Sequence, residues 1–402
     1  MRYGVLSFLC LATVIAYLQR SALGVPSKTI EGELGLGPKG MGLVWLGWYA
    51  SYAIFQLPSG WVAERLGSKS ALVIFAVLWS LLTGIVGLAT GFVGLVFLWS
   101  LMGGAQAGLF PCATRAIGAT FSRTEQAFAS GWLACAMAFG AALAQDVTGR
   151  LLGPLTWQEI LAVYSLPGLI WALAFAFAVP RPDAPLARTP TASSTKTPWS
   201  RLVTNPHMLL LCAQQLQRAG ATALFFTWFP RYLQETKGVT AVQSGSLAAW
   251  PLLAGMLGGL TGGFASDWLL RKTGRARLSR QGLAFCAMVV CASVSLASFW
   301  IEDAETAVLL ISIAAFCGYV GGVSAYAVAI AMGGKRVAPV FATMNMAGNI
   351  GAGLFPFAVG YLVEKTGNWG LALLLFATLY AGSGVCWLFL NPKGTLFDEE
   401  KT

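Results

Sequence analysis

Long apolar stretches alternate with short polar segments along most of this chain. Each stretch holds about 20 largely apolar residues, the length that an α-helix needs to cross the hydrocarbon core of a bilayer. The pattern therefore predicts an all-α membrane protein with twelve transmembrane helices. The predicted helices span residues 3–27, 41–64, 70–89, 92–116, 126–149, 155–178, 206–234, 241–268, 280–300, 305–331, 339–363 and 369–390.

One polar stretch interrupts this pattern near the middle of the chain. Residues 179–205 are rich in Pro, Ser, Thr and basic residues, as expected for a linker. Two similar turns, GWVAERLGSK from Gly60 and GFASDWLLRK from Gly263, follow the second and the eighth predicted helix. We therefore expect two pseudo-symmetric six-helix bundles, residues 1–178 and 206–402, joined by a cytoplasmic linker at 179–205 and ending in a short cytoplasmic tail. Internal repeats of this kind are typical of transporters.

Composition and charge agree with a protein embedded in a membrane. The 402 residues are 56% hydrophobic and 10% charged, against about 25% charged in ordinary soluble domains. The net charge of +10 arises from lysines and arginines that gather in alternate loops, with the linker and both termini on the richer side. The positive-inside rule therefore places both termini in the cytoplasm, and nucleic acid is not needed to explain the charge. We expect a multi-pass protein of the cell membrane, the inner membrane if the source is bacterial.

Two arginines depart from this distribution because they lie within apolar stretches. Arg20 lies in LATVIAYLQRSALGV, and Arg218 lies in MLLLCAQQLQRAGATALFF. Neither has an acidic residue within one helical turn, and a charge at bilayer depth costs roughly 3 kcal/mol or more. Such a charge is kept where it faces a water-filled cavity and meets an anion, which suggests a carrier for a small organic anion. The alternative is that both side chains reach the headgroups or bind backbone carbonyls.

The two similar turns resemble the loop signature of the major facilitator superfamily. Gly60, Glu64, Arg65, Gly67 and Lys69 form one copy, with Glu where the family usually has Asp, and Asp267, Arg271 and Lys272 form the second. Five further stretches resemble its anion:cation symporter family, which includes hexuronate, galactonate and phthalate transporters: YLQRSALGV, YAIFQLPSGW, AGLFPCATR, FFTWFPRYL and MNMAGNIGAG. The resemblance covers nearly the whole chain and implies a monomer that works by alternating access.

The acidic residues of both turns are candidates for a cytoplasmic gate. Glu64 lies at a predicted helix end, where it can pair with arginines of neighbouring loops and hold the two halves closed. Such a pair must break during alternating access. The alternative is an ordinary helix-end charge. The gate set is Glu64, Arg65 and Asp267.

Helical spacing places several polar side chains on shared faces. Trp45, Tyr49, Tyr52 and Gln56 follow one face of the second predicted helix, and Gln214 shares a face with Arg218. A planar guanidinium binds a carboxylate through two parallel hydrogen bonds. The alternative for these polar side chains is hydrogen bonding between helices. The predicted substrate-binding residues are Arg20, Tyr52, Gln56, Gln106, Gln214, Arg218, Asn345 and Asn349.

The chain departs from proton-coupled members of the resembled family at two positions. These carry an Asp before the first arginine and a Glu in the fourth helix, where this chain has Gln19 and Gln106. Trp99 stands where many relatives have an arginine. The remaining acid well inside a segment, Asp146, either forms a salt bridge with Arg150 or serves as a relocated proton site. The sequence therefore favours an anion exchanger or uniporter, or coupling through Asp146.

The leading functional hypothesis is transport of a sugar acid, such as a hexuronate or aldonate. A dicarboxylate or aromatic-acid carrier is the alternative, since two arginines also suit those anions. An enzyme or a receptor-like sensor is disfavoured because the sequence has one histidine, no metal-ligand cluster, no nucleophile motif and no GK[ST] loop for ATP. We expect no cofactor, and a small organic anion and the lipid bilayer as the partners.

Overall fold

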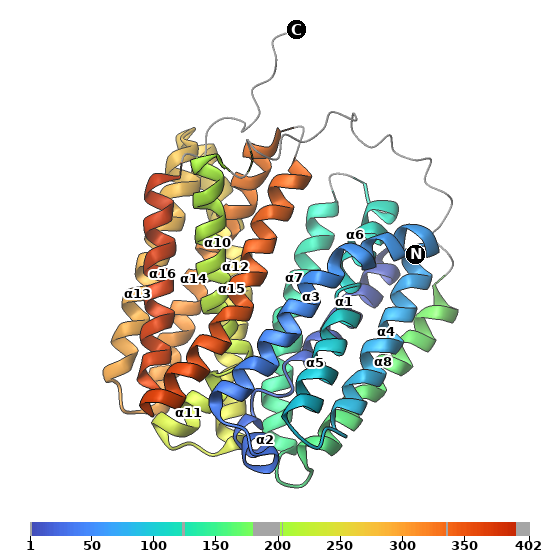
Figure 1. The fold of residues 1–402 in the computed structure, drawn as a ribbon. Coiled ribbons are helices and arrows are strands. Elements are labelled where there is room, and N and C mark those ends of the chain that lie inside the picture. The colour runs from blue at the N-terminus through green and yellow to red at the C-terminus, as the bar shows by residue number, and fades with distance from the viewer. Residues whose placement is uncertain (1, 123–124, 180–201, 203, 335–336, 391–402) are drawn as a thin grey trace. The chain divides into compact units, whose positions relative to one another are not determined.

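The computed structural model describes residues 2–122, 125–179, 202, 204–334 and 337–390, and these residues are almost entirely helical (Figure 1). The helices of the first half are α1 Arg2–Arg20, α2 Ser27–Leu34, α3 Pro38–Leu66, α4 Ser68–Val86, α5 Phe92–Gln106, α6 Leu109–Thr120, α7 Gln126–Leu151 and α8 Trp157–Ala178. Those of the second half are α10 Pro206–Phe226, α11 Phe229–Lys237, α12 Ala241–Thr273, η1 Arg277–Gly282, α13 Leu283–Ala297, η2 Ser298–Trp300, α14 Ala304–Gly333, α15 Val337–Thr366 and α16 Gly370–Phe389. The predicted linker lies almost wholly outside the described residues.

Helices long and apolar enough to cross a membrane number ten among the described residues. Two further helices, α3 with 29 residues and α10 with 21, are long but are not among these ten. Each of the twelve predicted segments is therefore largely helical, the fourth as α5 and α6 in succession, and the all-α membrane fold is confirmed. The Tyr52–Gln56 stripe lies on α3, and the Gln214–Arg218 face lies on α10.

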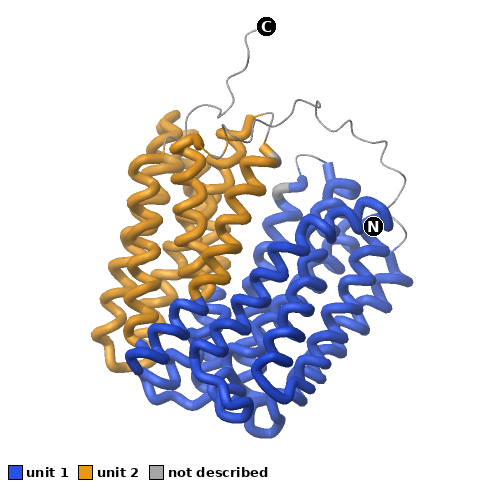
Figure 2. Tube along the Cα trace, in the orientation of Figure 1, with its two compact units in different colours: residues 1–187, 225–253, 356–369 blue, residues 188–224, 254–355, 370–402 orange. Residues whose placement is uncertain are grey.

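Two compact units make up the chain (Figure 2). Unit 1 comprises residues 1–187, 225–253 and 356–369, and unit 2 comprises residues 188–224, 254–355 and 370–402. Unit 1 thus includes parts of α10, α12 and α15, together with α11, in addition to the first half of the sequence.

The core of unit 1 holds α1 in place. Leu9 and Trp79 are fully buried, and Trp171 of α8 donates its indole N–H to the Phe8 carbonyl at 2.9 Å. The Trp171 ring also stacks on Phe175, with 4.7 Å between the ring centroids. This packing fixes the position of α1 and hence of the residues at its C-terminal end.

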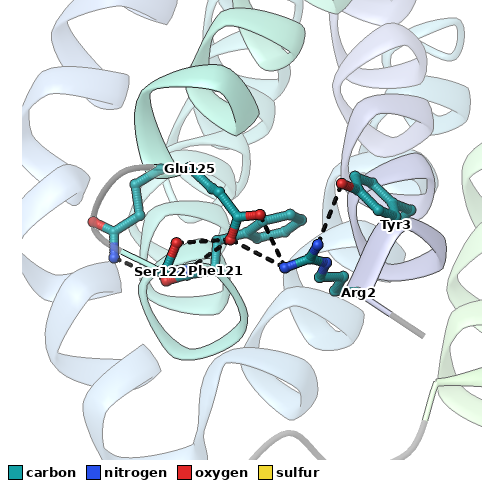
Figure 3. Close-up of polar contacts among 6 residues, drawn as sticks. Arg2, Tyr3, Phe121, Ser122 and Glu125 are labelled. Carbon is teal, nitrogen blue, oxygen red and sulfur yellow. Dashed lines mark hydrogen bonds and ion pairs between the residues drawn. The ribbon is translucent and has the colours of Figure 1, made fainter.

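The start of α1 is tied to the segment between α6 and α7. Arg2 Nη1 lies 2.9 Å from Glu125 Oε1, and the Ser122 hydroxyl donates to Glu125 Oε2 at 2.7 Å (Figure 3). The Ser122 hydrogen bond, together with the Arg2 charge, lowers the pKa of Glu125, so this carboxyl group stays ionised near neutral pH. The Tyr3 ring packs edge-on against Phe121, 6.2 Å away.

Glycines allow two helices of unit 2 to approach closely. A Cβ on Gly258 or Gly262 of α12 would overlap the backbone of Phe316 or Val320 on α14. A Cβ on Gly255 would lie 2.7 Å from the Tyr319 ring. The GxxxG spacing of α12 therefore serves helix packing, as it commonly does in membranes.

Candidate functional site

Arg20 is the last residue of α1, so the predicted first helix, 3–27, extends too far. Turns occupy residues 21–26, after which the short helix α2 begins. The Ser21 N–H still donates to the Tyr17 carbonyl at 3.2 Å, so the chain leaves the helix directly after Arg20. The arginine therefore stands at a helix end and not within a continuous helix.

Four aromatic rings surround the guanidinium of Arg20. The distances from Cζ to the ring centroids are 3.9 Å for Trp48, 4.6 Å for Tyr17 and 5.6 Å for both Tyr49 and Tyr52. We call these four rings the aromatic box. A cation over aromatic faces gains about 0.5–2 kcal/mol per favourable pair. Tyr49 is also a hydrogen-bond partner of Arg20. No carboxylate of the described residues forms an ion pair with Arg20.

A small cavity of about 10 Å³ adjoins Arg20 within unit 1. A cavity of this volume has room for about one water molecule. Besides the guanidinium, its lining includes the hydroxyls of Tyr49 and Thr227 and three indole rings, so its walls are mostly aromatic. The lining residues are Arg20, Trp45, Trp48, Tyr49, Trp99, Phe226 and Thr227.

Tyr52 lies beside Arg20, and Gln56 follows on the same face of α3. Tyr52 is 7% exposed and stacks on Trp48, with 5.0 Å between the ring centroids and 14° between the planes. Gln56, one turn farther along α3, is half-buried and is a hydrogen-bond partner of the Tyr52 side chain. The geometry thus brings together Arg20, Tyr52 and Gln56.

The two glutamines that replace family carboxylates act as hydrogen-bond donors to backbone. Gln19 Nε2 donates to the Tyr164 carbonyl at 2.8 Å, and Gln106 Nε2 donates to the Ala16 carbonyl at 2.9 Å. Both side chains are buried, and neither Oε1 atom has a partner among the described residues. An ionised carboxylate could not make these donations. Gln106, predicted to face substrate, directs its amide N–H to the end of α1, which supports the helix that carries Arg20.

In unit 2, Arg218 of α10 is 8% exposed and is held by a neighbouring amide. Its Nη2 donates to Gln215 Oε1 at 2.9 Å, while its Nε is buried without a hydrogen-bond partner among the described residues. Thr222 bonds back to the Arg218 carbonyl at 2.8 Å and contacts the Tyr380 hydroxyl at 3.1 Å. Sequence spacing places Gln215 beside Arg218 but does not identify it as the partner.

Two glycines make room for this pair, although neither stands out in the sequence. A Cβ on Gly322 of α14 would lie 2.9 Å from Arg218 Nη1, and a Cβ on Gly348 of α15 would lie 3.1 Å from Gln215 Nε2. Both look like ordinary packing glycines when only their neighbours in the chain are considered. They leave the space that the Arg218–Gln215 pair occupies.

The other predicted residues of unit 2 are Gln214, which adjoins this pair on α10, and two asparagines of α15. Gln214 is fully buried and donates to the Leu211 carbonyl of its own helix at 2.9 Å, leaving Oε1 without a partner among the described residues. Asn345 and Asn349 are half-buried, one turn apart on α15. Gln214 therefore uses one of its two amide N–H groups within its own helix.

The predicted gate residues lie at the ends of α3 and α12. Asp267 accepts a hydrogen bond from Arg280 Nη2 at 2.9 Å, and Arg280 Nη1 donates to Ser266 at the same distance. Glu64 is exposed and forms no ion pair with another described residue, whereas Arg65 lies 3.9 Å above the Trp61 ring. The two copies of the turn thus differ in their local pairing.

Asp146 of α7 forms the salt bridge with Arg150, which is one of its two predicted roles. Arg150 Nε and Nη2 donate to its two carboxylate oxygens at 2.9 and 3.1 Å. The Ser246 hydroxyl of α12 donates to Oδ1 at 2.5 Å. The carboxylate is therefore satisfied as an anion by three donors, an arrangement that favours a structural role.

Comparison with known proteins agrees with this architecture. The sequence pattern of the Major Facilitator Superfamily matches residues 9–337. A probable sulfoacetate transporter, SauU, of Cupriavidus necator is 28% identical, covering 98% of this chain and 95% of that protein. A hexuronate transporter of Bacillus subtilis is 29% identical, covering 97% and 96%. A bacterial homologue of the human lysosomal transporter Spinster, in an inward-facing and unoccupied conformation, has the same fold, with a TM-score of 0.76, 19% identity and coverage of 97% and 94%.

Proposed function

Because the chain belongs to the Major Facilitator Superfamily, we propose that it carries a small organic anion across the cell membrane by alternating access, with a sugar acid as the leading substrate. The observation that carries this proposal is Arg20, a cation set in an aromatic box beside a cavity, which no carboxylate of the described residues neutralises. A carrier keeps such a charge because an anionic substrate compensates it. The hexuronate transporter among the relatives supports the sugar-acid class.

Each half of the sequence contributes one arginine to this proposal. We propose that residues 1–178 and 206–402 form the two six-helix halves of a monomer, with Arg20 in the first and Arg218 in the second, and that both termini are cytoplasmic. The basic residues of the alternate loops support this orientation. Within unit 2, the charge of Arg218 is not neutralised by any described carboxylate, which supports its role as a substrate-binding residue.

A second candidate substrate class has its own supporting observation. The wall around Arg20 consists mainly of tryptophan and tyrosine rings, whose apolar faces suit an aromatic or compact anion better than a skeleton with a hydroxyl on each carbon. Each buried polar group left unpaired costs about 1–3 kcal/mol. A dicarboxylate, an aromatic acid or a compact sulfonate leaves no hydroxyls unpaired, and the probable sulfoacetate transporter among the relatives supports this class.

The mode of transport is inferred from the two glutamines. Gln19 and Gln106 cannot take up a proton and are bonded as neutral amides. We therefore propose anion exchange or uniport instead of coupling through a carboxylate at these positions.

Uptake into proteoliposomes tests the substrate class and the mode together. The panel would contain labelled glucuronate, galacturonate, galactonate, succinate, benzoate and sulfoacetate, each with and without a pH gradient and with internal unlabelled substrate. Sugar-acid uptake that needs internal substrate more than the gradient, and that Arg218→Ala abolishes, supports the proposal. Preference for benzoate, succinate or sulfoacetate would select the second class. No uptake of any acid would contradict both.

A further inference from the structure

Unit 1 contains a second group of charges, outside the aromatic box. Glu31 of α2 and Arg231 of α11 form an ion pair in which the carboxylate side chain is 7% exposed and the guanidinium side chain is 9% exposed. Among the acidic side chains that the structure describes, Glu31 is the one that is buried. A buried ion pair is costly to form, since the loss of hydration can exceed the Coulombic gain. Such a pair therefore calls for a functional explanation.

The surroundings of Arg231 connect this pair to further charges and to tryptophans. Arg231 Nε lies 3.6 Å from Glu235, one turn along α11, and Glu235 also pairs with Lys28 of α2 at 3.0 Å. The guanidinium lies 5.1 Å from the Trp369 ring, which packs edge-on against Trp228 at 5.4 Å. Two ion pairs thus join α2 to α11, with aromatic rings beside one of them.

More negative than positive charge faces Glu31. Besides Glu235, it faces Glu364 of α15, whose Oε2 accepts the Lys39 N–H at 3.0 Å. Burial raises the pKa of Glu31 above its ordinary value, and Glu235 and Glu364 raise it further. The charge and hydrogen bond of Arg231 offset this only in part. The carboxyl group therefore holds a proton more tightly here than it would in water.

We propose that Glu31 is a proton-binding site and that a proton bound there favours the packing of α2 against α11. This inference rests on the proposed function. Alternating access must separate α2 from α11 whenever the end of unit 1 that holds these two helices opens. Separation exposes Glu31 to water and returns it to ordinary proton affinity. The packed state binds the proton more tightly, so by linkage acid favours the packed state and rising pH favours separation.

A fluorescence titration of the full-length protein in detergent tests this site without any substrate. Trp369 lies beside Arg231 and packs against Trp228, so loosening of the Glu31–Arg231 pair changes the emission of these tryptophans. We expect a pH transition with a midpoint above about 4.3, the ordinary glutamate value, and its amplitude should fall in Trp369→Phe. Glu31→Gln should abolish the transition. A transition that persists in Glu31→Gln, or that never occurs in the native chain, would overturn the proposal.

Glu235→Gln is the matched variant, because Glu235 is exposed and touches the same arginine. Removing its negative charge should keep the transition and move the midpoint down by roughly 0.4 pH unit. An unchanged midpoint would contradict the site even if Glu31→Gln failed to fold. Because the titration needs no substrate, a normal transition in a protein that transports none of the acids would refute the proposed function and leave the proton site standing.

Discussion

Gln106 Nε2 lies 2.9 Å from the backbone carbonyl of Ala16, one turn before Arg20 on α1. The bond joins the end of α5 to the last turn of α1. It gives this glutamine a structural role that a carboxylate could fill only in its protonated form. The neutral amide therefore fixes the position of Arg20 at every pH.

Gln106→Glu should make the protein sensitive to alkali. The ionised side chain loses the donor and faces a carbonyl oxygen, which leaves buried groups unpaired at a cost of about 1–3 kcal/mol. Protonation restores a donor, so the loss of stability should be larger at pH 8 than at pH 5. Melting temperatures at both pH values measure this. If Gln106→Glu lowered the melting temperature equally at the two pH values, the hydrogen bond to the Ala16 carbonyl would not be the cause of the lost stability.

Arg20→Lys should lower substrate affinity even though the charge remains. An ammonium group cannot form the two parallel hydrogen bonds of a guanidinium or stack on the Trp48 ring, so we expect a fall of about tenfold or more. Competition binding to the purified protein measures the change. Arg2→Lys is the control, because Arg2 is exposed, lies over Tyr3 at 5.0 Å and should leave affinity unchanged. Equal affinity in Arg20→Lys would mean that only the charge matters.

Gly322→Ala should weaken binding by displacing Arg218. The added Cβ would meet Nη1 at 2.9 Å, and the guanidinium can move only by leaving Gln215. If Arg218 holds the substrate, the displacement also costs a charge-assisted hydrogen bond to it, about 1.5–3 kcal/mol or roughly 10- to 150-fold in affinity. Gly259→Ala is the control, because nothing lies within 4 Å of its added Cβ. Unchanged affinity in Gly322→Ala would remove Arg218 from the binding site.

Asp146→Asn should leave the response of uptake to a pH gradient unchanged. The Arg150 side chain is 67% exposed, so the lost salt bridge should cost at most about 1 kcal/mol of stability. Proteoliposome uptake with and without the gradient tests this. If the native protein shows gradient-driven uptake and Asp146→Asn loses it, Asp146 is the coupling site.

The positions of the long helices could be predicted because a lipid environment forces apolar stretches of fixed length into helices. The grouping of Arg20, Tyr52 and Gln56 was partly predictable, since helical spacing put Tyr52 and Gln56 on one face. The end of α1 at Arg20 was not, because residues 21–26 remain apolar while the chain turns.

The pattern of hydrophobic and polar residues could not predict contacts between segments that are far apart in the sequence. Glu31 and Arg231 are 200 residues apart, one in a predicted loop and the other near the end of the predicted helix 206–234, yet they are buried against each other. Likewise, nothing in the sequence around Gly322 and Gly348 distinguishes them from other packing glycines. Only the folded chain reveals that their missing Cβ atoms leave room for Arg218 and Gln215.

The termination of α1 at Arg20 also bears on the valence of the ligand. Peptide dipoles aligned along a helix place about half a negative charge at its C-terminal end. This partial charge stabilises the guanidinium where no described carboxylate does, and it lowers the net positive potential at the cavity beside Arg20. One negative charge on the substrate is then enough to neutralise the positive charge at Arg20. The second negative charge of a divalent substrate would need a cation other than Arg20.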